Sequence, residues 1–250
     1  MNRLNKLLFI VLACSAQQAI GGKIIHGREV LPNKLPYMAS VQHDGQHICG
    51  GFLITEEIVL TAAHCDDREL TVVLGTNDLS KVNESTMRYK VEKCQHPDYI
   101  DVLSGNDIMV LNLSRTSQIE PIQPPDDKMK IQSSTQCLVA GWGSIKTKGP
   151  AVDKLREVEV ATIDRETCEQ RWATPPLPAK TICAGGYKTR KGFCRGDSGG
   201  PLVCGKMAVG IVSFNSKKKL CDYPNRPNVY TDIKEFLTWI NNPKPKCNVN

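Results

Sequence analysis

The sequence predicts an all-β protein, built as a barrel or a sandwich, on two observations. Short apolar runs rich in Val, Ile and Leu recur between turn residues at the spacing of strands rather than helices. At 250 residues, the chain is also long enough for one large or two small hydrophobic cores. The runs that we expect to form strands are 51–62, 70–74, 108–113, 137–141, 155–163 and 206–212.

The first residues have the pattern of a secretory signal. Arg3 and Lys6 precede the apolar run 7–13, which is too short to cross a membrane. No later segment has the roughly 18 uninterrupted apolar residues that a membrane span needs. We therefore expect an exported protein without a membrane partner.

Two cleavage sites fit the end of this signal. Cleavage after Gly21 matches a small-x-small pattern, and cleavage after Ala16 is the alternative. We favour Gly21, which makes 1–21 the signal peptide and leaves 22–23 as a dipeptide propeptide before the domain 24–250.

Two further elements are visible in the second half of the chain. The proline-rich stretch 120–127 is typical of a connection between two halves. The one convincing helix is terminal, at about 230–242, where apolar residues fall at helical steps from Tyr230 to Ile240 before Pro243. We find no internal repeat and no low-complexity tract.

The net charge does not support a nucleic-acid partner. The full chain carries +6, but its first 23 residues contribute three bases, Arg3, Lys6 and Lys23, and no acid, so the rest carries only +3. Two basic clusters, 188–191 and 217–219, are interpreted as solvated surface. The alternative is that they bind acidic glycans or acidic substrate residues.

Cysteine content indicates a disulfide framework. Cys14 leaves with the signal, so ten of the eleven cysteines remain. An even number in an exported protein suggests five disulfides, whose pairing the cysteine count leaves open.

The hexamer 196–201, Gly-Asp-Ser-Gly-Gly-Pro, is the most informative stretch. It places Ser198 between glycines at a turn, where a nucleophile is exposed, and the N–H groups of Gly196 and Ser198 can converge on a developing oxyanion. Upstream, His64 offers a base and Asp107 offers an acid to orient it.

The order His, Asp, Ser and the flanking residues resemble the chymotrypsin-like serine proteases, which cleave peptides with a catalytic triad. The resemblance rests on four motifs, at 24–27, 61–65, 106–108 and 196–201. It implies two six-stranded antiparallel β-barrels with the active site between them and a C-terminal helix. We place the first barrel at about 24–125, the second at about 126–229 and the helix at about 230–242.

The resemblance assigns the chemistry to named residues. His64 is the general base, Asp107 orients it, and Ser198 attacks a peptide carbonyl. Ser213 is expected to donate a hydrogen bond to Asp107. The substrate-binding positions that it implies are Gly192, Phe193, Arg195, Ser213, Phe214, Asn215 and Asn228.

Substrate preference follows from the same positions. Gly192 stands at the expected floor of the primary pocket, so no acid awaits a substrate Lys or Arg. Phe193 and Asn215 are bulkier than the residues common there. We expect a constricted, polar-edged pocket for small or medium uncharged side chains, with Arg195 at the rim favouring acidic residues near the cut.

Activation is expected to require a cut between Lys23 and Ile24. The resemblance pairs the buried Asp197 with the new α-ammonium, so the uncut chain is a zymogen that needs an activating protease. His26 replaces a glycine common in the family, which should not block insertion of Ile24. The dipeptide propeptide is similar to those of granzymes and mast-cell granule proteases, which implies secretion or granule storage.

The resemblance also implies four disulfides. They are Cys49–Cys65, Cys137–Cys204, Cys168–Cys183 and Cys194–Cys221. Cys94 and Cys247 are left over, and we expect them to bridge within a monomer. The alternative is a disulfide-linked dimer.

Modifications, metals and partners complete the expectations. Asn83 and Asn112 are glycosylation acceptors, with Asn83 favoured because it lies in a polar loop. Thr76 and Asn77 replace an expected carboxylate in the family's calcium loop, so no metal or other cofactor is expected. Expected partners are peptide or protein substrates and protein inhibitors. The rival hypothesis is a weakly active or inactive protease homologue that binds glycans or microbial surfaces.

Overall fold

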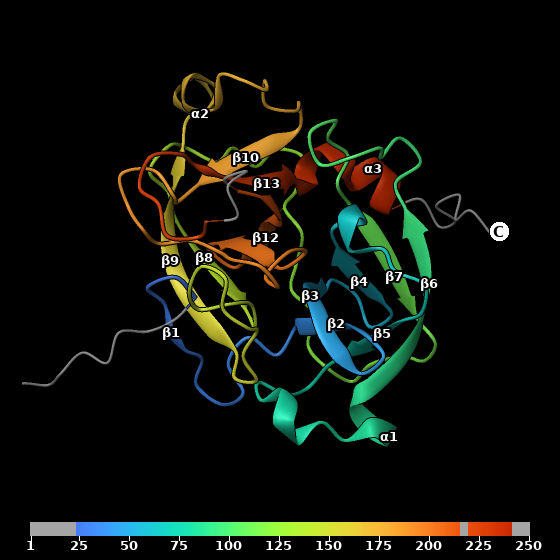
Figure 1. The fold of residues 1–250 in the computed structure, drawn as a ribbon. Helices are drawn as coiled ribbons and strands as arrows, with labels where there is room; N and C mark the ends of the chain where they lie inside the picture. Colours follow the sequence, from blue (N-terminus) through green and yellow to red (C-terminus); the bar gives the residue numbers. More distant parts are fainter. Residues whose placement is uncertain (1–23, 216–219, 242–250) are drawn as a thin grey trace, which may run out of the picture.

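The computed structural model describes residues 24–215 and 220–241, which form two closed six-stranded antiparallel β-barrels (Figure 1). The predicted fold class is confirmed. The predicted signal and propeptide (1–23), the cluster 217–219 and Cys247 lie outside the described residues.

The first barrel closes in the order β2-β3-β4-β7-β6-β5. Its strands are β2 (Met38–His43), β3 (Gln46–Leu53), β4 (Ile58–Thr61), β5 (Leu70–Val73), β6 (Arg88–Gln95) and β7 (Met109–Leu113). Branched and aromatic side chains such as Val41, Phe52 and Leu111 are fully buried inside it, as strand propensity predicts. The predicted run 51–62 is divided between β3 and β4, because the chain turns where the Ile54 N–H donates to the Ile58 carbonyl.

The second barrel contains β8 (Gln136–Gly141), β9 (Arg156–Ile163), β10 (Thr181–Ala184), β13 (Asn228–Asp232), β12 (Met207–Phe214) and β11 (Pro201–Cys204). The pairing of β8 with β9 closes it. Val139, Leu202 and Tyr230 are among its fully buried side chains. Tyr230, predicted to begin the terminal helix, lies instead in β13, opposite Ile182 and Val212.

The start of the domain pairs with a strand of the second barrel. The short strand β1 (Arg28–Glu29) pairs with β9. Glu157 of β9 is only 3% exposed, and its carboxylate accepts from Arg28 Nε at 2.8 Å and from Lys34 Nζ at 2.9 Å. These pairs compensate a buried charge that would otherwise be costly. They also connect the segment that follows Ile24 in the chain to the second barrel.

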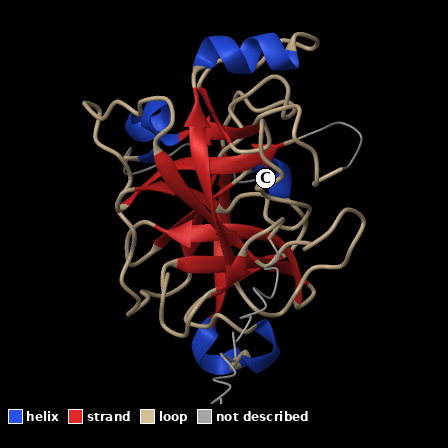
Figure 2. Ribbon diagram, turned by 90° about the vertical axis from the view of Figure 1, so that its left-hand side faces the viewer, coloured by secondary structure: helices blue, strands red, loops and turns tan. Residues whose placement is uncertain are grey.

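The few helices lie around the strands (Figure 2). The terminal helical segment is a 3₁₀ turn at Ile233–Phe236 followed by α3 (Leu237–Ile240), and its buried side chains join the first barrel's core. The sequence did not lead us to expect α2 (Arg165–Trp172), whose N-cap is Asp164, or the one-turn helix α1 (Glu84–Met87). No described helix has the length and apolar character to cross a membrane.

All four disulfides that the resemblance implied are present. Cys94 is buried in β6, and its expected partner Cys247 lies outside the described residues, so that pairing stays a prediction.

Candidate active site

His64 and Asp107 meet at the edge of the first barrel. His64 lies in the 3₁₀ turn Ala63–Cys65 directly after β4, and Asp107 precedes β7, the neighbour of β4. His64 Nδ1 is 2.8 Å from Asp107 Oδ2, and the His64 N–H donates to Asp107 Oδ1 at 2.9 Å. An ionised carboxylate only accepts, so Nδ1 carries the proton and Nε2 is left as the basic nitrogen.

The second barrel completes the environment of this acid. Ser213 of β12 donates to Asp107 Oδ2, and Thr231 Oγ1 of β13 donates to the Asp107 carbonyl at 2.9 Å. Asp107 is 1% exposed; burial works against its charge, but hydrogen bonds and charge from His64, with the Ser213 bond, lower the pKa of this carboxyl. Asp107 therefore remains an anion that can stabilise an imidazolium.

Ser198 lies in a tight glycine turn between the barrels. Gly196 and Gly199 have φ values of +95° and +79°, a region that favours glycine. A Cβ at Gly199 would lie 2.1 Å from Thr61 Oγ1, so only glycine fits there. The Ser198 carbonyl accepts from the Gly50 N–H at 2.7 Å, which ties the turn to the first barrel.

Asp197 points away from the cavity into the protein. It is fully buried, and its two oxygens accept from the N–H groups of Gly143 and Cys194, both at 2.8 Å. Burial raises the pKa of this carboxyl to about 7, against the opposing hydrogen bonds. Ile24 is also fully buried, in the second barrel's core, and Ile25 bridges to Gly192.

The raised pKa of Asp197 predicts a pH-dependent stability of the uncut chain. The ordinary value is 3.8 and the folded value about 7, so between these the folded state binds more protons than the unfolded state. The contribution of Asp197 to the free energy of unfolding therefore falls by about 4 kcal/mol as pH rises through this interval, and this contribution is constant below it. Urea unfolding between pH 3 and 8 should show a larger fall in the wild type than in Asp197→Asn, which keeps the carboxyl of Asp232, whose pKa burial raises to about 6. Parallel curves for the two proteins would contradict the prediction.

The cavity beside Ser198 has a volume of about 560 Å³. Five of the predicted substrate-binding residues line it: Phe193, Arg195, Ser213, Phe214 and Asn215. Arg195 and Lys148 are exposed and give its rim positive charge. Asn215 Nδ2 donates to the Phe193 carbonyl at 3.2 Å, which ties two sides of the cavity together.

The other two predicted positions do not line this cavity. Asn228 is 2% exposed, and a Cβ at Gly192 would lie 2.1 Å from Asn228 Nδ2, so the amide fills the space next to this glycine. The hydroxyl of Tyr223, which sequence reasoning missed, donates to Asn228 Oδ1 at 2.6 Å. The Phe193 ring packs against Tyr230 in the core, although the residue also lines the cavity.

His47 is a second residue whose place the sequence did not indicate. Its ring bridges Ser40 Oγ at 2.8 Å and the carbonyl oxygen of Gly196 at 2.9 Å. A histidine within a strand pattern carries no local signal of such a contact, because Gly196 lies 149 positions away.

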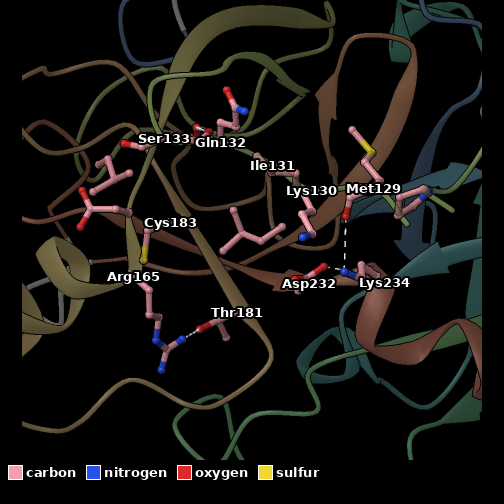
Figure 3. Close-up of a pocket in the computed structure, with 15 residues that line it drawn as sticks. Met129, Lys130, Ile131, Gln132, Ser133, Arg165, Thr181, Cys183, Asp232 and Lys234 are labelled. Carbon is pink, nitrogen blue, oxygen red and sulfur yellow. Dashed lines mark hydrogen bonds between the residues drawn. The ribbon is translucent and has the colours of Figure 1, made fainter. Parts of the chain in front are cut away.

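Other candidate sites are separate from this centre. A second cavity, of about 400 Å³, is lined by residues such as Lys130, Asp232 and Lys234 (Figure 3). Of the predicted site residues, only Cys183 lines it. Within the described ranges, the one group with metal-ligating geometry is Cys49, His64 and Cys65, and its two sulfurs form a disulfide.

The two glycosylation candidates differ in their surroundings. Asn83 is exposed and caps α1, accepting from the N–H groups of Ser85 and Thr86. Asn112 is half-buried in β7, with Nδ2 3.5 Å from Cys94 Sγ. Of the two, Asn83 is the one that stands free of the barrel.

Comparison with known proteins gives consistent relatives. The family model described as Trypsin matches residues 24–240. The chain is 40% identical over 242 residues to mast cell protease 3 of Ovis aries, covering 94% of this chain and 93% of that protein. It is 38% identical over 244 residues to granzyme B(G,H) of Mus musculus, covering 94% and 97% respectively.

A solved structure supports the same assignment. Neuropsin, described as a serine protease expressed in the limbic system of mouse brain, superposes with a TM-score of 0.77 at 31% identity, covering 86% of this chain and 96% of that chain. With the matching family model and relatives across nearly the whole length, the chain belongs to the trypsin family of serine proteases.

Proposed function

We propose that the protein is a secreted or granule-stored serine endopeptidase that acts through Ser198, His64 and Asp107. The observation that carries the proposal is the His64–Asp107 pair, held by residues of both barrels beside the cavity that Ser198 lines. Its granzyme and mast cell protease relatives support the same kind of activity and location.

The mechanism follows from the donor and acceptor roles at this site. His64 Nε2 takes the proton of Ser198 Oγ as that oxygen attacks the peptide carbonyl, and the N–H groups of Gly196 and Ser198 stabilise the oxyanion. His64 then protonates the leaving amine. The amine departs, and the acyl group stays bound to Ser198 as an acyl-enzyme. Water, activated by the same nitrogen, releases the acid product. Each oxyanion donor is worth about 10²–10³ in turnover.

Activation is proposed to follow a cut after Lys23. A buried carboxylate needs a compensating charge, and the Asp197 carboxylate has two backbone donors but a raised pKa. The α-ammonium of a new Ile24 terminus is that charge in our proposal. With a signal that ends at Gly21, the activator would remove the dipeptide 22–23; with a signal that ends at Ala16, an activator with trypsin-like preference is the simpler hypothesis.

The primary pocket is proposed to accept uncharged side chains. Asn228 occupies the space beside Gly192 where a pairing acid would stand, so an unpaired substrate Lys or Arg would be costly to bury. Arg195 and Lys148 at the rim favour acidic residues flanking the cut.

Probe labelling and a peptide library test this function. We expect a fluorophosphonate to label the protein that begins at Ile24, and the library to return uncharged primary residues with acidic neighbours. Cleavage after Arg or Lys would reject the pocket assignment. Absence of labelling in correctly cut, folded protein would reject the enzyme and favour the glycan- or microbe-binding alternative. The structural argument for that alternative is a crowded pocket, in which the Asn215 amide donates to the Phe193 carbonyl.

Two covalent features belong to the same proposal. We propose Asn83 as the glycosylated residue rather than Asn112, because Asn83 is exposed. Cys94 and Cys247 are proposed to pair within one chain, which keeps the protein a monomer.

A further inference from the structure

A chain of hydrogen bonds runs from the surface of the first barrel to the turn that carries Ser198. Arg88 Nη1 donates to Gln42 Oε1 at 2.9 Å, and Gln42 Nε2 donates to Ser40 Oγ at 3.0 Å. Ser40 Oγ is 2.8 Å from His47 Nδ1, and His47 Nε2 is 2.9 Å from the Gly196 carbonyl oxygen. Four bonds thus connect a guanidinium to the proposed oxyanion turn.

The two ends of this chain fix the direction of every bond. A guanidinium only donates and a carbonyl oxygen only accepts. His47 must therefore carry its proton on Nε2, and Ser40 must donate to His47 Nδ1. Burial lowers the pKa of His47 to about 4, against the opposing bond to Gly196, so the ring is neutral in this arrangement.

Gln42 passes this direction from Arg88 to Ser40. It is 3% exposed in β2, and its amide both accepts from Arg88 and donates to Ser40, two roles that an ionised carboxylate or an apolar side chain cannot combine. The network matters for Gly196 because this residue has φ +95° and no side chain to hold its peptide in place.

We propose that Gln42 and Arg88 are positioning residues for the oxyanion turn, acting through Ser40 and His47. The inference rests on the proposed peptidase function. The Gly196 carbonyl is fixed by His47, and the Gly196 N–H one peptide earlier in the chain is the proposed oxyanion donor. Loosening the chain should therefore lower turnover without altering substrate binding.

Several charged groups surround the chain of bonds. Arg88, Glu84 and Asp153 line a cavity of about 420 Å³ that also borders His47. Glu84 is paired with Arg88, and the buried Asp197 follows Gly196 directly. A new charge at position 42 would act on His47 together with the charges of these groups.

The decisive variant is Gln42→Glu, which reverses the polarity of the chain. An ionised carboxylate at position 42 only accepts, so Ser40 would donate to it and accept from His47 Nδ1–H. His47 could then keep its Nε2–H in only two ways: as an imidazolium, or with the introduced carboxyl at position 42 protonated. We expect the variant-to-wild-type ratio of kcat to be near one at about pH 6 and to fall about tenfold by about pH 9, with KM unchanged.

Matched variants separate this effect from a general loss of packing. Gln42→Met removes the amide without reversing Ser40, so its kcat should fall about threefold with a ratio that does not depend on pH. Thr71→Val removes another acceptor of Arg88 Nη1 at 2.8 Å and leaves the chain intact, so kcat should not change. A pH-independent ratio for Gln42→Glu, or an equal loss in Thr71→Val, overturns the proposal.

Imidazole NMR gives a readout that needs no activity. The ¹⁵N shifts of His47 in protein beginning at Ile24, with Ser198→Ala to prevent self-digestion, should report the Nε2–H tautomer. In the Gln42→Glu background, they should report protonation at Nδ1. A Nδ1–H tautomer in the parent would overturn the proposal. The expected NMR result, combined with no fluorophosphonate labelling of the cut protein that retains Ser198, would reject the peptidase function alone.

Discussion

Replacing Ser198 with alanine should lower peptide turnover by a factor on the order of 10⁶. The reason is that the variant has no oxygen to form an acyl-enzyme, while the cavity and the surrounding turn are retained. Ser198 is only partly buried and its backbone bond to Gly50 does not involve the side chain, so the melting temperature should change little. Steady-state cleavage of a library-derived peptide measures the loss.

A His64 variant is the control for cooperative action. His64→Ala should cost about as much as Ser198→Ala, and the double variant should cost no more than either, because the two groups act in one proton transfer. Asp107→Asn should lower turnover about 10⁴-fold, because an amide that donates to Nδ1 selects the wrong tautomer. Additive losses in the double variant would contradict a shared role.

The sequence predicts a site residue when that residue lies within a short local motif. His64, Asp107 and Ser198 each lie in a short motif whose residues have local reasons to be there, such as the positive φ of Gly196 and Gly199. His47 and Gln42 have no such motif. Their roles depend on a hydrogen bond between barrels, and periodicity within one strand carries no information about it.

The fold shows the same division. Tyr230 fits both a helical spacing and a strand pairing. It lies in a strand because its side chain is buried within the second barrel there. The helix α2 escaped prediction because it has only two buried side chains, Cys168 and Trp172, and therefore no apolar stripe. Asp164 before it was the available capping signal.

The primary pocket was predicted only in outline. The absence of an acid could be predicted from Gly192, but the place of Phe193 could not. Its ring turns into the core against Tyr230, a packing choice that depends on the whole barrel. Asn215 lines the cavity, and its amide donates to the Phe193 carbonyl.

Cutting the chain after Lys23 should raise kcat/KM by about 10²–10⁴. Leaving one member of a buried ion pair unpaired costs on the order of 3–5 kcal/mol, which corresponds to that factor if the uncut chain reaches the working geometry of the turn only at that cost. The α-ammonium of Ile24 is the positive charge that the cut creates, on a residue of the second barrel's core. Kinetics before and after treatment with a lysine-specific protease, with N-terminal sequencing, measure the gain.

The pH dependence of the cut protein tests whether the ion pair between Ile24 and Asp197 causes the gain in kcat/KM. An α-amino group has an ordinary pKa of about 7.7–8.0, and pairing with Asp197 raises it, so the fraction of enzyme with an intact ion pair should be full below that raised value and should be lost, with the activity, as pH rises through it. The same pairing should lower the pKa of Asp197 from the value of about 7 that burial gives it in the uncut chain. Asp197→Asn should therefore gain little on cutting and lack this alkaline limb. An equal gain in Asp197→Asn would show that the cut acts through something other than this carboxylate.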